Sequence, residues 1–195
     1  MQSNRRETQQ RSLTRLSVVG KSTSLLIWGL ALCWLLGDAY LWLSQGREML
    51  RAMLVPLSES QPLLASADFA LSRTTEIALF VLDMLPTLLT SVVWLLTGLF
   101  FWRLARNELW TARNFRLLWR AGLLNLIGPF LNSLIWTAQG LAVSRDLPPG
   151  ERIFVFSLGL STSGVYEVVV GIVLCAFAWM IRESTRLYEE NALYI

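Results

Sequence analysis

The sequence contains no histidine and only two cysteines, which excludes several kinds of site at once. Without histidine, the chain has no histidine metal ligand and no histidine general base. Cys33 and Cys175 both lie inside apolar runs, where an unpaired cysteine behaves as a small apolar side chain, and their separation does not fit a zinc site. We therefore expect two unpaired cysteines, no metal site and no cofactor.

Charged residues are also scarce. They make up 16% of the 195 residues, whereas soluble domains carry about 25%. The apolar residues, 54% of the chain, stand in long blocks, and about 20 helical residues are enough to cross the hydrocarbon core of a membrane. Nine tryptophans agree with this class, since tryptophan concentrates at membrane–water boundaries. We predict an all-α integral membrane protein, a four-helix bundle in the lipid bilayer.

Four spans are predicted, at residues 24–43, 77–102, 117–142 and 163–181. Residues 1–23 are polar and are expected to form a flexible tail. Residues 182–195 form a second polar tail with a short helix, in which Arg186 and Glu190 are four residues apart. For the first span, a cleaved signal peptide is the alternative, but the apolar run continues beyond the length of a normal signal core.

Prolines and glycines divide these segments. We expect Pro86 to kink the second span and Gly128-Pro129 to interrupt the third. Pro148-Pro149-Gly150 predicts a turn before the fourth span. The apolar run at 153–160 is ambiguous between an interfacial segment and an early start of that span. Residues 47–54 have apolar residues at helical spacing, and they either continue the first helix or lie on the membrane surface until Pro56 and Pro62 break the segment.

A basic turn separates the second and third spans. Its arginines are Arg103, Arg106, Arg113, Arg116 and Arg120. Thr111 is the predicted N-cap of the third helix, accepting from the amide of Asn114, with Trp110 and Phe115 as a hydrophobic staple. The two tails and this turn hold twelve of the seventeen basic residues. Because positively charged loops stay inside the cell, both termini and the turn are predicted to be cytoplasmic.

The pattern around this turn resembles a known family. The turn reads aromatic-Thr-x-x-Asn, with Leu four and Gly eight residues after the Asn: Trp110-Thr111, Asn114, Leu118 and Gly122. The chain ends in Leu187-Tyr188-Glu189-Glu190-Asn191-Ala192-Leu193-Tyr194-Ile195. Over residues 90–195 the chain is similar to domain-of-unknown-function family 2975, small four-span bacterial membrane proteins. The resemblance implies a four-span fold in the bacterial cytoplasmic membrane and, because some relatives neighbour genes of helix-turn-helix regulators, a signalling partner.

Polar and small residues inside the predicted spans recur at helical spacing. The stripes are Ala31, Trp34 and Asp38; Asp83, Thr87, Thr90, Trp94 and Thr97; Asn125, Gly128, Asn132, Trp136 and Gln139; and Gly164, Glu167, Gly171 and Ala178. Small residues let helices approach closely, and polar side chains bond across helices. Each stripe therefore predicts the face by which its helix packs in the bundle.

Three acidic residues fall at a similar predicted depth. Asp38, Asp83 and Glu167 lie about 6–9 Å below the outer surface if each residue rises about 1.5 Å. Three carboxylates at one level could share a proton or a cation, so these residues, with Asn132, are the candidate ligand or cation residues. The alternative is structural: the acids reach outer water or pair with nearby arginines, namely Arg47, Arg73, Arg145 and Arg152. A fourth span that started at residue 153 would also separate Glu167 from the other two acids.

The arginines of the basic turn have two interpretations as well. They set the topology and contact anionic lipid headgroups, at about 1 kcal/mol per residue, or they bind an acidic cytoplasmic partner. Nucleic-acid binding is not expected of so short a membrane-tied segment. The sequence has no Ser-His-Asp, HExxH, P-loop or CxxC arrangement, so we expect no enzyme. The leading hypothesis is a sensor or regulatory protein of the bacterial inner membrane; the alternative is a small proton- or cation-coupled transporter or channel subunit, which would require a homo-oligomer.

Overall fold

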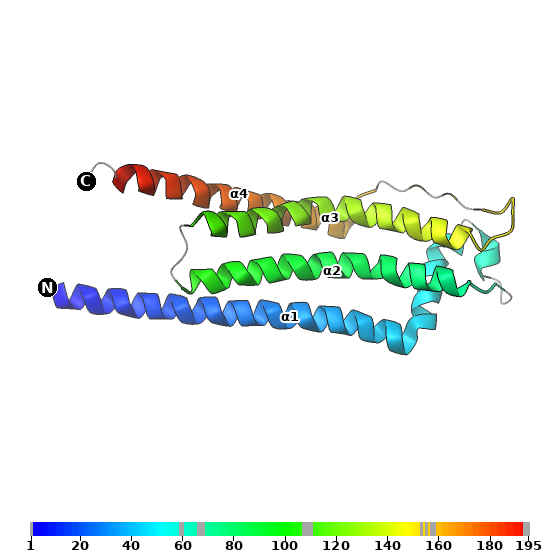
Figure 1. Cartoon of the computed structure of the whole chain (residues 1–195), viewed down its shortest axis with the longest axis horizontal. Coiled ribbons are helices and arrows are strands. Elements are labelled where there is room, and N and C mark those ends of the chain that lie inside the picture. Colours follow the sequence, from blue (N-terminus) through cyan, green and yellow to red (C-terminus); the bar gives the residue numbers. More distant parts are fainter. Residues whose placement is uncertain are drawn as a thin grey trace. The chain divides into compact units, whose positions relative to one another are not determined.

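The computed structural model describes residues 2–58, 61–65, 69–106, 111–152, 154, 156 and 159–192, with side chains from Thr14 onward. Its elements are α1 (Gln2–Ser58), the short 3-10 helix η1 (Pro62–Ala65), α2 (Arg73–Leu104), α3 (Ala112–Ser144) and α4 (Thr162–Ala192) (Figure 1). Each of the four α-helices contains a stretch long and apolar enough to cross a membrane, and each contains one predicted span. The chain is therefore an all-helical multi-pass membrane protein.

Helix α1 begins much earlier than the first predicted span. The flexible tail expected for residues 1–23 is wrong for the described part, because the helix runs without a break from Gln2. Residues 2–19 contain neither glycine nor proline and include four Arg and three Gln, which favour the helical state even without an apolar face. The cytoplasmic location of this segment stays a prediction.

A bend divides α1 in its C-terminal third, at Gln45. Gln45 has non-helical angles (φ −129°, ψ 26°), and Figure 1 shows the ribbon turning there. The preceding Ser44 donates its hydroxyl to the carbonyl of Tyr40 (2.8 Å), and Gly46 follows. Serine bonds of this kind bend helices, and glycine lowers the cost of a bend. The segment 47–54 is therefore a helical continuation of α1 beyond a bend, and the helix passes Pro56 before it ends at Ser58.

Two expectations about internal breaks change in the structure. The predicted interruption at Gly128-Pro129 is wrong, because α3 is continuous from Ala112 to Ser144. Helix α2 also continues across Pro86, and the kink expected there stays a prediction. Within membrane helices, neighbouring groups satisfy the carbonyl that proline leaves without a donor. Helix α4 begins only at Thr162, and the described residues of the run 153–160 are not helical, so this run is not part of the fourth helix.

A helix cap, a turn and an ion pair that the sequence predicts can each be compared with the structure. The N-cap prediction is confirmed, because the Asn114 amide donates to Thr111 Oγ1 (3.3 Å); its staple partner Trp110 lies outside the described residues. Gly150 has φ +102°, which explains why the Pro-Pro-Gly turn ends in glycine. In the C-terminal segment, Arg186 contacts Glu190 as predicted (3.2 Å) and also Glu183 (3.2 Å). Both cysteines are free.

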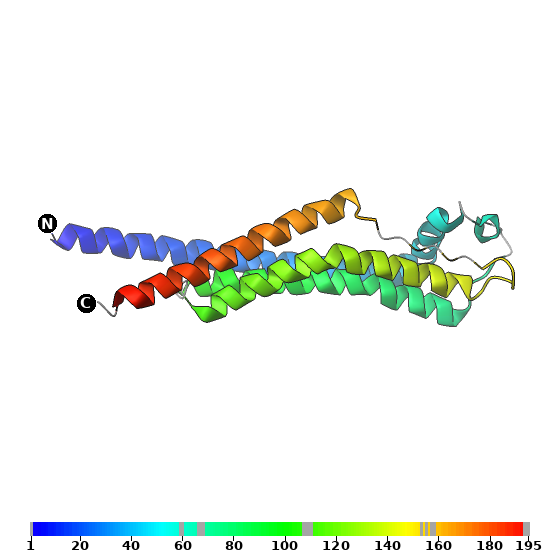
Figure 2. The same cartoon turned by 90° about the horizontal axis from the view of Figure 1, so that it is seen from above.

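The chain forms two compact units, and all four α-helices contribute to both, α4 to the second only with its first turn. The first unit consists of Met1–Cys33, Thr90–Ile127 and Tyr166–Ile195. In it, the start of α1, the end of α2, the start of α3 and the end of α4 lie at one end (Figures 1 and 2). Trp28 on α1 packs over Gly98 on α2, stacks at 5.8 Å from Trp102 and donates to the Leu95 carbonyl (3.3 Å). A side chain at position 98 would collide with the Trp28 ring.

Within the first unit, α3 and α4 touch through their backbones. A Cβ atom on Gly171 would lie 2.9 Å from the carbonyl oxygen of Gly122, and a Cβ atom on Gly122 would lie 2.5 Å from Cys175 Sγ. Ala178 then packs with Leu118 in a small apolar cluster. The predicted small-residue stripe of the fourth helix is therefore confirmed as a packing face at Gly171 and Ala178, where small side chains permit close approach.

The second unit consists of Trp34–Leu89 and Gly128–Val165. Its apolar core is built from both sides of the α1 bend, η1, α2 and the end of α3: Trp42, Leu57, Leu64, Leu79, Val143 and Leu147. Beyond α3, the carboxylate of Asp146 accepts a hydrogen bond from the backbone amide of Ser72 (2.7 Å). Ser72 is in turn the N-cap of α2, because its hydroxyl accepts from the backbone amide of Thr75. Partial burial disfavours the charge on Asp146, but the hydrogen bonds from Ser72 and Thr75 and the neighbouring Arg145 outweigh it and lower the pKa of Asp146.

The backbone contact of α3 and α4 yields a first prediction. We expect Gly171→Ala to destabilise the protein by about 1–3 kcal/mol, because the new methyl group meets the Gly122 carbonyl, which cannot move without shifting a helix. Gly29→Ala is the matched control, since its Cβ atom meets nothing within 4 Å in α1. Unfolding of the purified protein in mixed micelles measures both. Equal stabilities of the two variants would contradict the close packing.

Candidate functional site

Two aspartates inside the spans of the second unit lie close together. Asp38 comes from α1 and Asp83 from α2, and they are near enough for electrostatic repulsion to act between them. Thr87 Oγ1 donates to Asp38 Oδ2 (2.5 Å), and Trp42 Nε1 donates to Asp83 Oδ2 (2.7 Å). The side-chain amide of Gln139, from α3, is close enough to Asp83 to act as a further donor. We call these five residues the aspartate cluster.

In the aspartate cluster, the hydrogen-bond donors to the two carboxylates are neutral side chains rather than arginines. Its donors Trp42, Thr87 and Gln139 are each 8% exposed, so the hydrogen bonds are shielded from solvent. In lipid an unpaired polar group is costly, and donors from neighbouring helices remove that cost. Pairing with Arg47, Arg73, Arg145 or Arg152, the structural alternative, is not what holds Asp38 or Asp83 in the described residues.

Sequence reasoning found the two aspartates but missed Trp42. The predicted inner stripe of the first span named Ala31, Trp34 and Asp38, but Trp34 is 53% exposed. Trp42, one helical turn beyond Asp38, is the buried tryptophan on this side. Its spacing of four from Asp38 was the available signal. Gln139 belonged to the predicted amide stripe, where it was expected to act as packing glue, and it is close enough to Asp83 to donate across helices.

A site shared by the three carboxylates stays a prediction. In the described residues, no three side chains of the metal-binding types come together in a group that could hold a metal ion. Glu167 belongs to the first unit, whereas Asp38 and Asp83 belong to the second. Glu167 is half-buried on α4, and Asn132 is exposed on α3. Roles for Glu167 and Asn132 in binding a ligand or cation stay predictions.

The arginines of the basic turn divide into two groups. Arg113, Arg116 and Arg120 are all exposed and lie on one face of α3, at offsets of three and seven residues; we call them the arginine stripe. The opposite face carries the buried Asn114, Leu118 and Ala121, which pack within the first unit. Packing therefore fixes the rotation of α3 and turns three guanidinium groups outward.

The other two arginines of the turn, Arg103 and Arg106 at the end of α2, make closer contacts with the protein than the arginine stripe does. Arg106 lies over the ring of Trp102, at 5.6 Å from the centroid. Arg103 is half-buried, and its Nη1 atom is buried without a hydrogen-bond partner in the described residues. Arginine stacked on an aromatic ring keeps its charge while covering apolar surface, as is usual at membrane boundaries.

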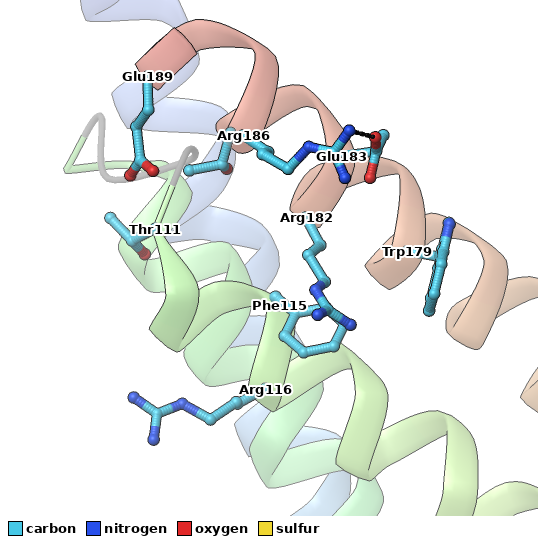
Figure 3. A pocket seen from close by; sticks show the side chains of 9 residues that line it. Thr111, Phe115, Arg116, Trp179, Arg182, Glu183, Arg186 and Glu189 are labelled. Carbon is cyan, nitrogen blue, oxygen red and sulfur yellow. Dashed lines mark ion pairs between the residues drawn. The ribbon is translucent and has the colours of Figure 1, made fainter.

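A groove lies between the start of α3 and the end of α4 in the first unit. Its volume is about 640 Å³, and nine residues line it: Thr111, Phe115, Arg116, Trp179, Arg182, Glu183, Thr185, Arg186 and Glu189 (Figure 3). The guanidinium carbon of Arg182 lies 5.6 Å from the centroid of the Phe115 ring and 5.3 Å from that of Trp179. The only local signal for this groove is the spacing of three between Trp179 and Arg182, which places both on one face of α4.

The aspartate cluster generates a testable prediction. We expect Trp42→Phe to destabilise the protein by about 0.6–2 kcal/mol, because phenylalanine keeps the packing against Phe80 but cannot donate to Asp83. Tyr40→Phe, on the exposed side of α1, is the control, as it also removes one polar hydrogen and should be neutral. Unfolding in mixed micelles compares them. An unchanged stability of the Trp42 variant would show that this hydrogen bond does not hold the cluster.

Comparisons with known proteins assign neither a family nor a function to this chain. No protein-family model matches the chain, and no curated protein and no solved structure matches it. The resemblance to domain-of-unknown-function family 2975 therefore stays a prediction from the residues around Thr111 and at the C-terminus. What the sites can do follows from their own geometry: a paired-aspartate cluster among the spans, and a row of outward-facing arginines beside an aromatic groove.

Proposed function

We propose that this chain is a non-enzymatic regulatory or sensory protein of the bacterial inner membrane, which acts by binding an acidic protein partner at the arginine stripe. In this proposal both termini and the α2–α3 turn face the cytoplasm. The observation that carries it is the outward orientation of Arg113, Arg116 and Arg120 on a helix face opposite the packed one. Exposed like charges on one rigid face recruit a partner of opposite charge and set its orientation.

Two further features support a partner-binding role. Arg113 and Arg120 form no ion pair in the described part of the chain, so binding a partner there would break no internal salt bridge. The capped first turn holds the stripe on a regular helix, so little order has to be gained on binding. The acids among the spans of the second unit are, by contrast, already bonded to protein donors.

The partner is tested by site-specific photocrosslinking in intact cells. A photoreactive residue at position 113 is expected to capture one defined protein, and the additional substitution Arg120→Glu should reduce that capture at least about tenfold, because a charge reversal replaces attraction by repulsion. A probe at Leu26, an exposed position in the apolar part of α1, is the control and should capture no such protein. Capture of lipid alone from position 113 would refute the proposal.

The second candidate function is a proton- or cation-coupled transporter or channel subunit that works as a homo-oligomer. It is favoured by one observation: two carboxyl groups from different helices lie close together within apolar spans. Ionisable residues in spans commonly mark proton or ion pathways. A pair of carboxyl groups can hold a single proton or a cation between them.

This candidate is tested by flux into proteoliposomes. If the pair carries protons or cations, Asp38→Asn and Asp83→Asn should each abolish the flux, because each removes one of the two charges. Glu76→Gln, an exposed acid in the first turn of α2, is the matched control and should leave flux unchanged. Wild-type vesicles without a proton or cation flux would exclude the transporter.

A further inference from the structure

Arg182 holds a position that the proposed function does not use. Its guanidinium group lies against two aromatic rings, Phe115 from α3 and Trp179 from α4. Figure 3 shows the Arg182 side chain running from α4 toward the Phe115 ring. It forms no ion pair and no hydrogen bond in the described residues. Because aromatic rings attract the positive charge without accepting conventional hydrogen bonds, the N–H donors of Arg182 remain available to a ligand.

The other charges of the groove do not compensate Arg182. Arg186 bridges Glu183 and Glu190, at 3.2 Å from each, so these side chains bind one another. Glu189 lies seven residues beyond Arg182 on the same helix, about 10 Å farther along its axis at about 1.5 Å per residue. The guanidinium group of Arg116 extends away from the other lining side chains in Figure 3. The centre of the groove is therefore cationic and aromatic.

The groove also lies where the apolar part of α4 ends. The residues directly before Arg182 are apolar, whereas those after it include the charged Glu183, Arg186, Glu189 and Glu190. Trp179, Phe177 and Met180 are 54%, 52% and 52% exposed, which provides an apolar surface next to the groove. Tryptophan and arginine at the end of a span lie at the level of the lipid headgroups. A volume of about 640 Å³ is within the range of small-ligand sites, about 300–1,000 Å³.

We propose that this groove binds an anionic phospholipid, with the headgroup phosphate on the Arg182 guanidinium group and an acyl chain along the exposed apolar surface of α4. An arginine edge matches two phosphate oxygens and forms paired charge-assisted hydrogen bonds. Basic pockets beside membrane helices bind lipid headgroups on the cytoplasmic side by the same chemistry. The site uses residues outside the arginine stripe, apart from the outward-directed Arg116, and does not depend on a protein partner.

Lipid binding is measured on the full chain in detergent, by native mass spectrometry with phosphatidylglycerol and phosphatidylcholine. We expect phosphatidylglycerol to bind at least about tenfold more tightly than phosphatidylcholine, and Arg182→Gln to remove this preference, since the paired charge-assisted bonds are lost. Arg15→Gln, at an exposed site in α1 without an ion pair, makes the same charge change and should keep the preference. If both variants lost the preference for phosphatidylglycerol equally, the lipid would be bound by the overall positive charge of the protein rather than at Arg182, and the proposal would be overturned.

A second measurement keeps Arg182 intact, in case its substitution disturbs the packing of the two rings. A photoreactive residue at position 185, which lines the groove, is placed in vesicles of equal phosphatidylglycerol and phosphatidylcholine. Enrichment of phosphatidylglycerol in the crosslinked lipid supports the site, and equal labelling of the two lipids overturns it. Soluble glycerol phosphate or an acidic peptide that displaces the bound lipid at equal concentration would show that the groove takes a free phosphate or a protein instead.

Discussion

The absence of water as a hydrogen-bonding partner inside the membrane governs the arrangement of this chain. A polar side chain within a span is stabilised by a donor or acceptor on a neighbouring helix or on its own backbone. Thr87 and Trp42 serve the two aspartates, while Thr97 and Thr137 bond back to carbonyls four residues earlier. The same constraint explains why apolar residues cover the outside: Leu25, Val81 and Ile172 are all at least half exposed, as lipid contact allows.

The helices and their order could be predicted because the signals for them are local. Apolar blocks gave four spans that all lie inside observed helices, and the cap at Thr111 and the pair Arg186–Glu190 each depend on residues three or four apart. The failures concern cases in which a local signal is weak or is overridden. Residues 2–23 carry no apolar pattern, so helical propensity alone decides there, and the proline at position 129 is tolerated because membrane helices have no competing solvent for their backbone groups.

The sites were predictable only in part, since they depend on which side chains reach one another across helices. Asp38 and Asp83 are recognisable as charged residues in apolar runs. The sequence near Asp83 does not indicate, however, that its partners are Trp42 and Gln139 on two other helices. The rotation of α3 follows from where Asn114, Leu118 and Ala121 pack, and this rotation turns the arginine stripe outward. The groove at Arg182 needs α3 and α4 side by side, a contact set by the pair Gly122 and Gly171.

The early start of α1 has a mechanical consequence. From Gln2 to Ser44 every residue is helical, so the polar segment from Gln2 to Lys21 is a rod of about 30 Å at about 1.5 Å per residue, continuous with the apolar part of the same helix. The four arginines and one lysine of this segment therefore belong to the same continuous helix as the apolar part, so a change in the tilt of the apolar part would displace these five charges with it.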